Sequence, residues 1–271
     1  MITISEPSQA STGPTSRLYL WQQRTFYLGP LMEPLLVSQG AACFGVSLGG
    51  AIQFSSKKIK EKISCQSILI PPGARIECDT GTAPIAICML DPLCCDHARL
   101  LPFMQYETQG VAYNVEDEQA YIDAFSTLYQ QKPSPEETYL RFHKIISQQQ
   151  RQDVKHHVDQ RISKVIQLIQ ENIGDNLSIE ILANEVGLSI PRLTQLFRLQ
   201  TGVPMRRYRL WHRVFRSLVD ITASGTLTNS ALAAGFSDAS HFNRTFRSMF
   251  GMTPSHLLIQ PNGLEIYAEQ K

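Results

Sequence analysis

The stretch Ala231-Leu-Ala-Ala-Gly-Phe-Ser237 repeats an earlier stretch, Ala183-Asn-Glu-Val-Gly-Leu-Ser189. The second copy follows the first by about 48 positions, and a repeat of this length is typical of a duplicated structural unit. In each copy a small residue, Ala183 or Ala231, lets another helix approach closely, and the glycine four positions later can adopt the left-handed conformation that ends a helix. A hydroxyl or carboxylate side chain can then cap a new helix. The pattern therefore predicts two helix-turn-helix units.

The second helix of each expected unit has an apolar face and a polar face. Leu193 and Phe197 mark the apolar face in the first unit, and Phe242 and Phe246 mark it in the second. The opposite faces carry donors and cations, which are the side-chain types that contact base edges and phosphates in a major groove. Together with two arginines of the connecting segment, they give these candidate DNA-binding residues: Arg192, Thr194, Gln195, Arg198, Arg206, Arg209, Ser240, His241, Asn243, Arg244 and Arg247. A solvated helix face without a DNA role is the alternative interpretation.

The run from Gly235 to Pro254, Gly-Phe-Ser-Asp-Ala-Ser-His-Phe-Asn-Arg-Thr-Phe-Arg-Ser-Met-Phe-Gly-Met-Thr-Pro, resembles the signature of the AraC/XylS family of bacterial transcription regulators. Residues 182–202 resemble the first helix-turn-helix unit of that family. The resemblance covers roughly the last 100 residues, with departures at Ser230, Leu257 and Leu258. It implies a transcriptional activator or repressor that binds double-stranded DNA. It also implies a small-molecule effector, a homodimer and a contact with RNA polymerase as further partners.

Composition and charge narrow the class of protein. A chain of 271 residues has room for about two domains, and no apolar run approaches the ~20 residues that cross a bilayer. The Ser-, Thr- and Pro-rich N-terminus does not have the pattern of a signal peptide, so we expect a cytoplasmic protein without a membrane partner. The net charge is only +1, but residues 190–250 hold nine arginines against Asp220 and Asp238. This local excess favours a polyanionic partner.

All six cysteines lie in the N-terminal half of the chain: Cys43, Cys65, Cys78, Cys88, Cys94 and Cys95. A cytoplasmic chain keeps its thiols reduced, and no paired Cys-x-x-Cys motif indicates zinc, so we expect no disulfide framework, no metal and no cofactor. The adjacent Cys94 and Cys95 leave open a regulator that senses redox state or a soft metal. The simpler interpretation is that the cysteines are small apolar residues of strands.

Short apolar segments separated by turn residues predict strands over 24–28, 35–38, 42–48, 51–55, 67–70, 74–78 and 84–90. Their spacing favours a barrel or sandwich, and Ser67-Ile-Leu-Ile-Pro-Pro-Gly73 resembles a strand and turn of a cupin-like barrel. A metal-dependent cupin enzyme needs converging histidine and carboxylate ligands. The first histidine, His97, follows the last expected strand. We therefore expect no enzyme activity, with a cupin-type enzyme as the remaining alternative, whereas a ligand pocket inside the barrel stays open.

Helical spacing of apolar residues predicts helices over 116–131, 136–150 and 158–173. A further long helix is expected from Pro204 to about Asp220. It should connect the two helix-turn-helix units and hold their second helices, which would read the DNA sequence, about one DNA turn, ~34 Å, apart. On this helix Arg213 is either a phosphate contact or an internal strut.

The sequence thus predicts an α+β fold, with an N-terminal cupin-like β-barrel flanked by helices and a C-terminal all-α domain that contains both helix-turn-helix units. The expected divisions are a flexible arm over 1–16, a regulatory or dimerisation domain over 17–146, a linker over 147–156, the DNA-binding domain over 157–260 and a tail over 261–271.

Overall fold

The structure is a computed structural model, and it describes residues 15–22, 24–31, 33–38, 40–59, 61–91, 95–147, 158–175, 177–224, 227–255 and 263–269. Most of the expected arm, and the expected linker apart from Ser147, lie outside these ranges. Cys94, Leu257 and Leu258 also lie outside them.

The N-terminal half folds into two β-sheets that pack face to face. The larger sheet has the order β10-β11-β7-β4-β9-β2-β1-β12, with the bounds β1 (Ser16–Trp21), β2 (Arg24–Pro30), β4 (Ala42–Ser47), β7 (Ser67–Ile70), β9 (Pro84–Leu90), β10 (Met104–Thr108), β11 (Val111–Val115) and β12 (Leu264–Ala268). The smaller sheet has the order β3-β8-β5-β6, with the bounds β3 (Leu35–Val37), β5 (Ile52–Ser55), β6 (Ile63–Cys65) and β8 (Ile76–Asp79). Among the described strands these remain two separate ladders. Of the barrel or sandwich that the strand spacing favoured, the described strands form a sandwich, because a closed barrel needs its edge strands to pair with each other.

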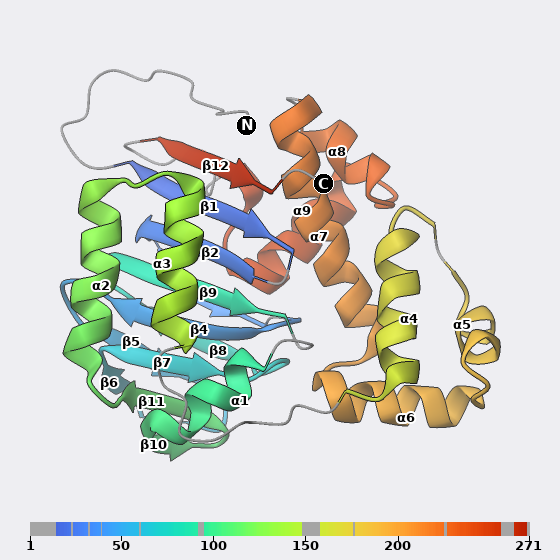
Figure 1. The fold of residues 1–271 in the computed structure, drawn as a ribbon, viewed down its shortest axis with the longest axis horizontal. Coiled ribbons are helices and arrows are strands. Elements are labelled where there is room, and N and C mark those ends of the chain that lie inside the picture. The colour runs from blue at the N-terminus through green and yellow to red at the C-terminus, as the bar shows by residue number, and fades with distance from the viewer. Residues whose placement is uncertain are drawn as a thin grey trace.

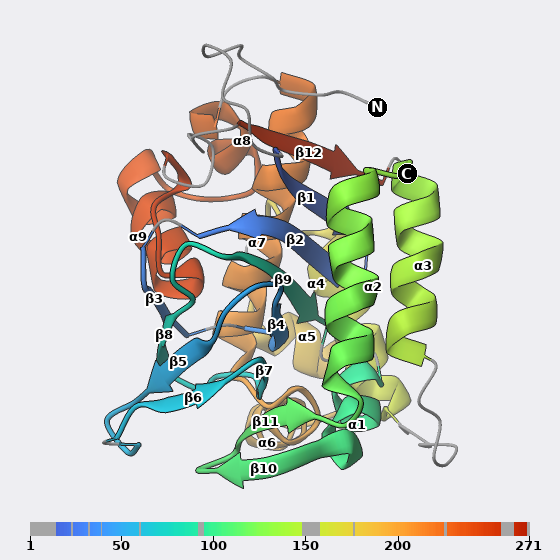
Figure 2. The ribbon, with the colours of Figure 1, turned by 90° about the vertical axis from the view of Figure 1, so that its left-hand side faces the viewer.

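Both faces of the larger sheet are covered. Successive side chains of a strand point to opposite faces, so Leu18 and Leu20 of β1 join the core between the sheets while Tyr19 and Trp21 point the other way. Helices α2 (Glu118–Gln131) and α3 (Pro135–Ser147) pack on this outer face, as Figure 2 shows. The short helices α1 (Asp96–Leu100) and η1 (Leu101–Phe103) lead from β9 to β10.

The expected tail contains a strand of the N-terminal sheet. Residues Leu264–Ala268 form β12, which pairs in parallel with β1, with Ile266 opposite Leu18. Both Leu264 and Ile266 are buried in the core between the sheets. The division at residue 261 therefore needs correction, because this segment returns to the N-terminal domain (Figure 1).

The C-terminal half contains both predicted helix-turn-helix units, α5–α6 and α8–α9. The helices of this half are α4 (Gln160–Glu171), α5 (Ile179–Glu185), α6 (Ile190–Thr201), α7 (Met205–Ser224), α8 (Leu227–Ala233) and α9 (Ala239–Phe250). Gly187 and Gly235, in the two turns, both have positive φ, as the repeat predicted. Asp238 caps α9 by accepting a hydrogen bond from the His241 amide at 2.7 Å, whereas Ser189 precedes α6 without a side-chain cap. Among the described residues, no helix combines the length and apolar character that crossing a membrane requires.

The two helix-turn-helix units belong to different cores. The first unit packs with α4 and the start of α7 around Phe197 and Tyr208, in a cluster of its own. The second unit shares one apolar cluster with the β-sandwich, to which it contributes Phe242, Phe246 and Met249. The second unit is therefore tied to the N-terminal domain by apolar packing.

Gly251, which ends α9, is the point of closest approach between the second unit and the sandwich. Its φ is +78°, and a Cβ there would lie 2.7 Å from the backbone nitrogen of Leu36 and 2.9 Å from the Cα of Leu35 in β3. Only a residue without a side chain fits this contact.

Gly251→Ala should lower the free energy of unfolding by more than Gly110→Ala, by at least about 1 kcal/mol. Gly110 has a similar φ of +82° but nothing within 4 Å of its would-be Cβ, so its substitution introduces only the backbone strain, about 1–3 kcal/mol. Urea unfolding of the two variants measures the difference. Equal losses would mean that the contact between α9 and β3 does not constrain the protein in solution.

Candidate nucleic-acid interface

Helix α6 presents one polar face to solvent. Arg192, Thr194, Gln195 and Arg198 are exposed, while Leu193, Leu196 and Phe197 are buried beneath them. Arg192 Nη1 donates to Gln195 Oε1 at 2.9 Å. This bond orders two of the candidate side chains before any ligand arrives.

Helix α9 has the same arrangement. Ser240, Asn243, Arg244 and Arg247 are exposed, and His241 is half-buried. The His241 ring packs edge-on against Phe236, with ring centroids 5.3 Å apart, and its Nδ1 lies 3.2 Å from Ser237 Oγ. The hydrogen bond from the His241 amide is the largest of several influences that lower the pKa of Asp238, the capping residue.

Helix α7 joins the two units and sets the distance between them. Its 20 residues span about 30 Å at 1.5 Å per residue, close to one turn of duplex DNA, ~34 Å. Figure 1 shows α6 at one end of α7 and α8 at the other. The geometry is compatible with the connector that the sequence predicted.

A cleft of about 440 Å³ opens between the two units. Its walls come from α5, α7 and α9, and the residues that line it are Ile179, Met205, Arg206, Arg209, Leu210, Arg213 and His241. Candidates from two separate helices, Arg206 and Arg209 of α7 and His241 of α9, thus meet at one surface. Burial and the charge of Arg213 together lower the pKa of Arg209, so the cleft concentrates positive charge.

Arg213 acts as an internal strut. Its Nε donates to the carbonyl oxygen of Ile173, after α4, at 3.2 Å. Its guanidinium also lies against the turn of the second unit, where a Cβ on Gly235 would come within 3.1 Å of Arg213 Cζ. Of the two roles that the sequence left open, the structure shows these internal contacts.

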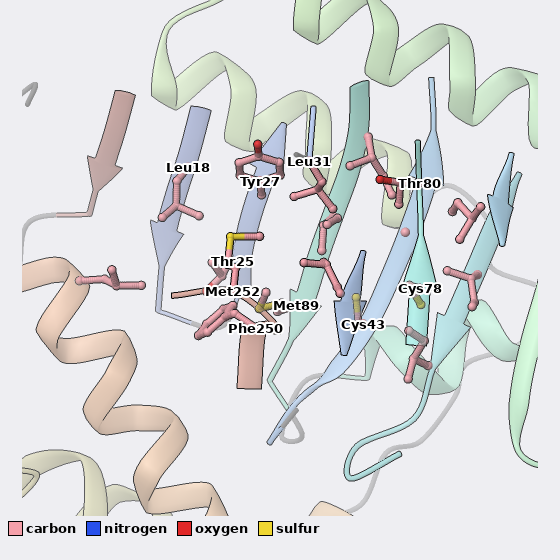
Figure 3. A pocket seen from close by; sticks show the side chains of 18 residues that line it. Leu18, Thr25, Tyr27, Leu31, Cys43, Cys78, Thr80, Met89, Phe250 and Met252 are labelled. Atoms are coloured by element: carbon pink, nitrogen blue, oxygen red, sulfur yellow. The ribbon is translucent and has the colours of Figure 1, made fainter. Parts of the chain in front are cut away.

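A second cavity lies between the two sheets. The sequence allowed for a ligand pocket there but predicted none of the residues that line it. This cavity measures about 60 Å³ and its walls are almost wholly apolar (Figure 3). Most of the lining comes from the inner faces of the sheets, but Leu218 of α7, Phe250 of α9 and Met252 complete it. Alternation along the strands could have identified the sheet residues, whereas no local pattern identifies a wall supplied by the other half of the chain.

The cysteines inside the sandwich behave as apolar residues. Cys43 and Cys78 line the cavity and Cys65 is buried nearby. Burial raises the pKa of Cys65 to about 12 and raises that of Cys78 further, so these thiols stay protonated and are poor nucleophiles and metal ligands. Among the described residues, no group of three or more His, Cys, Asp or Glu side chains is placed to hold a metal ion. The redox or soft-metal alternative gains no support.

Polar contacts also join the two halves of the chain. Asp91, after β9, lies 3.4 Å from His212 Nε2 and accepts from the Tyr208 hydroxyl at 3.5 Å, and all three side chains are buried. Arg207 donates to the hydroxyl of Ser38 at 2.6 Å. No local pattern in the sequence indicates this contact, since Asp91 and His212 are distant in the chain.

Comparison with known proteins identifies the C-terminal region. Residues 182–259 match the family described as "Helix-turn-helix domain". The transcriptional activator RhrA of Rhizobium meliloti is 34% identical over 101 residues, and the transcriptional activator RhaS of Escherichia fergusonii is 27% identical over 100 residues. The C-terminal region is a helix-turn-helix domain. These matches cover 36% of this chain and 32% and 36% of the two relatives, so the chain spans about a third of the length of these relatives.

The whole chain is similar in fold to ToxT from Vibrio cholerae. A ToxT structure described as bound to an unsaturated fatty acid aligns with a TM-score of 0.57 at 14% identity, over 92% of this chain and 98% of that one. Another, bound to (E)-4-(8-methylnaphthalen-1-yl)but-3-enoic acid, aligns with a TM-score of 0.52 at 13% identity, over 86% and 96%. At such identities the likeness shows the fold alone. It confirms the predicted arrangement of a β-rich N-terminal region and a helical C-terminal domain.

Arg213→Ala should lower the free energy of unfolding by about 1.5–3 kcal/mol, because it removes a charged donor from a carbonyl group and leaves a gap beside the turn of the second unit. Arg216→Ala, one turn along the same helix, should change it by less than about 0.5 kcal/mol, since its exposed pair with Asp220 contributes little. Urea unfolding separates the two. Similar losses would show that Arg213 is not a strut.

Proposed function

We propose that this protein is a sequence-specific DNA-binding transcription regulator in which α6 and α9 enter adjacent major grooves of one site. The cleft between the two helix-turn-helix units carries the proposal. There Arg206 and Arg209 of α7 converge with His241 of α9, and two arginine cations beside a polar side chain of the second unit suit a polyanion that passes from one unit to the other.

The candidate residues divide into two roles by their position. On the exposed faces, the linked Arg192 and Gln195 of α6 and the neighbouring Asn243 and Arg244 of α9 have the donor and acceptor patterns that read base edges. Arg206 and Arg209 line the cleft between the two units, and we propose that they contact the phosphate backbone of the DNA between the two grooves. The first group would set sequence preference and the second would set affinity.

We propose further that a small molecule in the cavity between the sheets controls DNA binding. Two observations support this: the cavity is closed by Phe250 at the end of α9, and two ToxT structures of the same fold contain bound small molecules. A ligand that contacts this wall would bias the position of the second unit, and so its alignment with the first.

The other partners remain proposals that follow from the family resemblance. They are a second copy of the chain and RNA polymerase. For the second copy we propose the exposed face of α3, where Tyr139 and Leu140 lie beside Trp21 in a shallow groove.

Arg244→Ala should weaken binding to a site selected from random DNA by about 1–3 kcal/mol and relax its sequence preference, because a base contact is lost. Arg206→Ala should weaken binding to selected and random DNA alike and reduce the slope of log affinity against log salt by about 1, because a phosphate contact is lost. Fluorescence anisotropy with labelled duplexes at several salt concentrations measures both effects.

Arg141→Ala is the matched control, because it removes the same charge from an exposed position on α3 of the N-terminal domain. It should leave both the affinity and the salt slope unchanged. Equal affinity of the wild-type protein for selected and random duplexes would contradict sequence-specific binding. Equal effects of Arg141→Ala and Arg244→Ala would contradict the assignment of the face on α9.

A further inference from the structure

Among the described residues, the walls of the cavity between the sheets carry no cation. Its lining consists of aliphatic, aromatic and sulfur-containing side chains, with Thr25, Tyr27 and Thr80 as the hydroxyl groups. Figure 3 shows these side chains converging from both sheets. The Tyr27 hydroxyl donates to the Pro30 carbonyl oxygen at 2.5 Å, and burial raises its pKa to about 12. Tyr27 thus remains neutral at ordinary pH.

The cations on the neighbouring strands point to the other face of the sheet. Arg17 precedes Leu18 in β1, and its guanidinium donates to the carbonyl oxygens of Leu128 and Tyr129 at the end of α2, at 3.1 and 2.5 Å. Arg24 precedes Thr25 in β2 and makes a bidentate ion pair with Asp96, at 2.6 and 2.9 Å. Because side chains alternate along a strand, neither arginine can turn into the cavity without a change of register.

From this lining we infer that the cavity takes an uncharged apolar ligand and excludes carboxylates. The inference rests on the proposed control of DNA binding by a small molecule, and it specifies the chemical class of that molecule. An ionised carboxylate inside these walls would lose its hydration and gain no partner. The two ToxT structures, described as bound to a fatty acid and to a butenoic acid, would then share the fold but not the ligand chemistry.

The volume of the cavity in this structure is smaller than such a ligand needs. About 60 Å³ exceeds what a single water requires but falls short of the ~150 Å³ cavity that admits benzene. The sheet walls are held by hydrogen-bonded ladders, whereas Leu218, Phe250 and Met252 form a wall without such bonds. The ligand should therefore enter by displacing this wall.

The test uses two probes of equal chain length, 1-decanol and decanoate, in competition with the neutral fluorophore N-phenyl-1-naphthylamine on the full-length protein. At pH 8 decanoate should bind at least ~100-fold more weakly than decanol, because only about one molecule in a thousand carries the proton. Its affinity should rise about tenfold per pH unit as the pH falls from 8 to 6, whereas that of decanol stays constant. Burial raises the pKa values of Tyr27 and Cys78 in the lining, so neither group ionises in this range.

Three variants sharpen the test. Met252→Lys places a cation of similar shape at the cavity wall and should improve decanoate binding at pH 8 by at least tenfold relative to decanol. Met252→Leu should keep the wild-type preference for decanol. Gln53→Lys adds the same charge on the exposed side of β5, between the inward-facing Ile52 and Phe54, and should also keep that preference.

Comparable affinities of wild-type protein for decanol and decanoate at pH 8 would overturn the inference, as would the binding of neither probe. The wild-type pH series decides the question even where Met252→Lys fails to fold. Anisotropy titrations with labelled DNA on the same preparation test the DNA-binding proposal separately. A failure of the ligand chemistry is therefore distinguishable from a failure of the DNA-binding proposal.

Discussion

The packing of the second helix-turn-helix unit into the β-sandwich constrains the whole molecule. Phe246 and Met249 of α9 lie in the same apolar cluster as the inner face of the sheets, and Gly251 abuts β3. Separating these surfaces would expose apolar area at about 25 cal/mol per Å². Moving the second unit relative to the sandwich therefore costs free energy, and a change inside the sandwich acts on α9 through this shared core.

The first unit is held differently. Its core around Phe197 and Tyr208 is its own, and it meets the N-terminal domain where Gly202 and Val203 lie close to Pro72 and Gly73. It also meets that domain through polar contacts, Asp91 with His212 and Ser38 with Arg207. Such contacts are directional and can be exchanged for water with little loss. Helix α6 thus packs in a core separate from the sandwich and α9 packs in the core shared with it, while the single helix α7 contributes to both cores and joins the two units.

Local patterns explain why the helix-turn-helix units could be predicted from the sequence. The positive φ of Gly187 and Gly235 and the buried faces of α6 and α9 depend on residues within one turn or one helix. The candidate DNA-binding residues on these helices could also be predicted, because a helix with one buried face exposes its opposite face to solvent. The strands that went unpredicted had weaker local signals. The apolar run of β1 contains Arg17, and β6 has only three residues.

The features that sequence reasoning missed all involve residues far apart in the chain. Asp91 and His212 form a buried pair only because two domains meet, and the same is true of Phe250 as part of the cavity wall. Helical spacing alone cannot distinguish the two possible roles of Arg213, a phosphate contact or an internal contact. Only the position of the Ile173 carbonyl distinguishes them. Periodicity carries no information about such contacts.

The parallel pairing of β12 with β1 gives the molecule an unusual chain path. The DNA-binding helices leave the N-terminal domain after α3 and the chain rejoins it at Leu264, so this domain is an insertion with two covalent attachments rather than a terminal module. Because β12 forms one edge of the larger sheet, its loss would leave the backbone groups of β1 on that side unpaired and open to pairing with another chain.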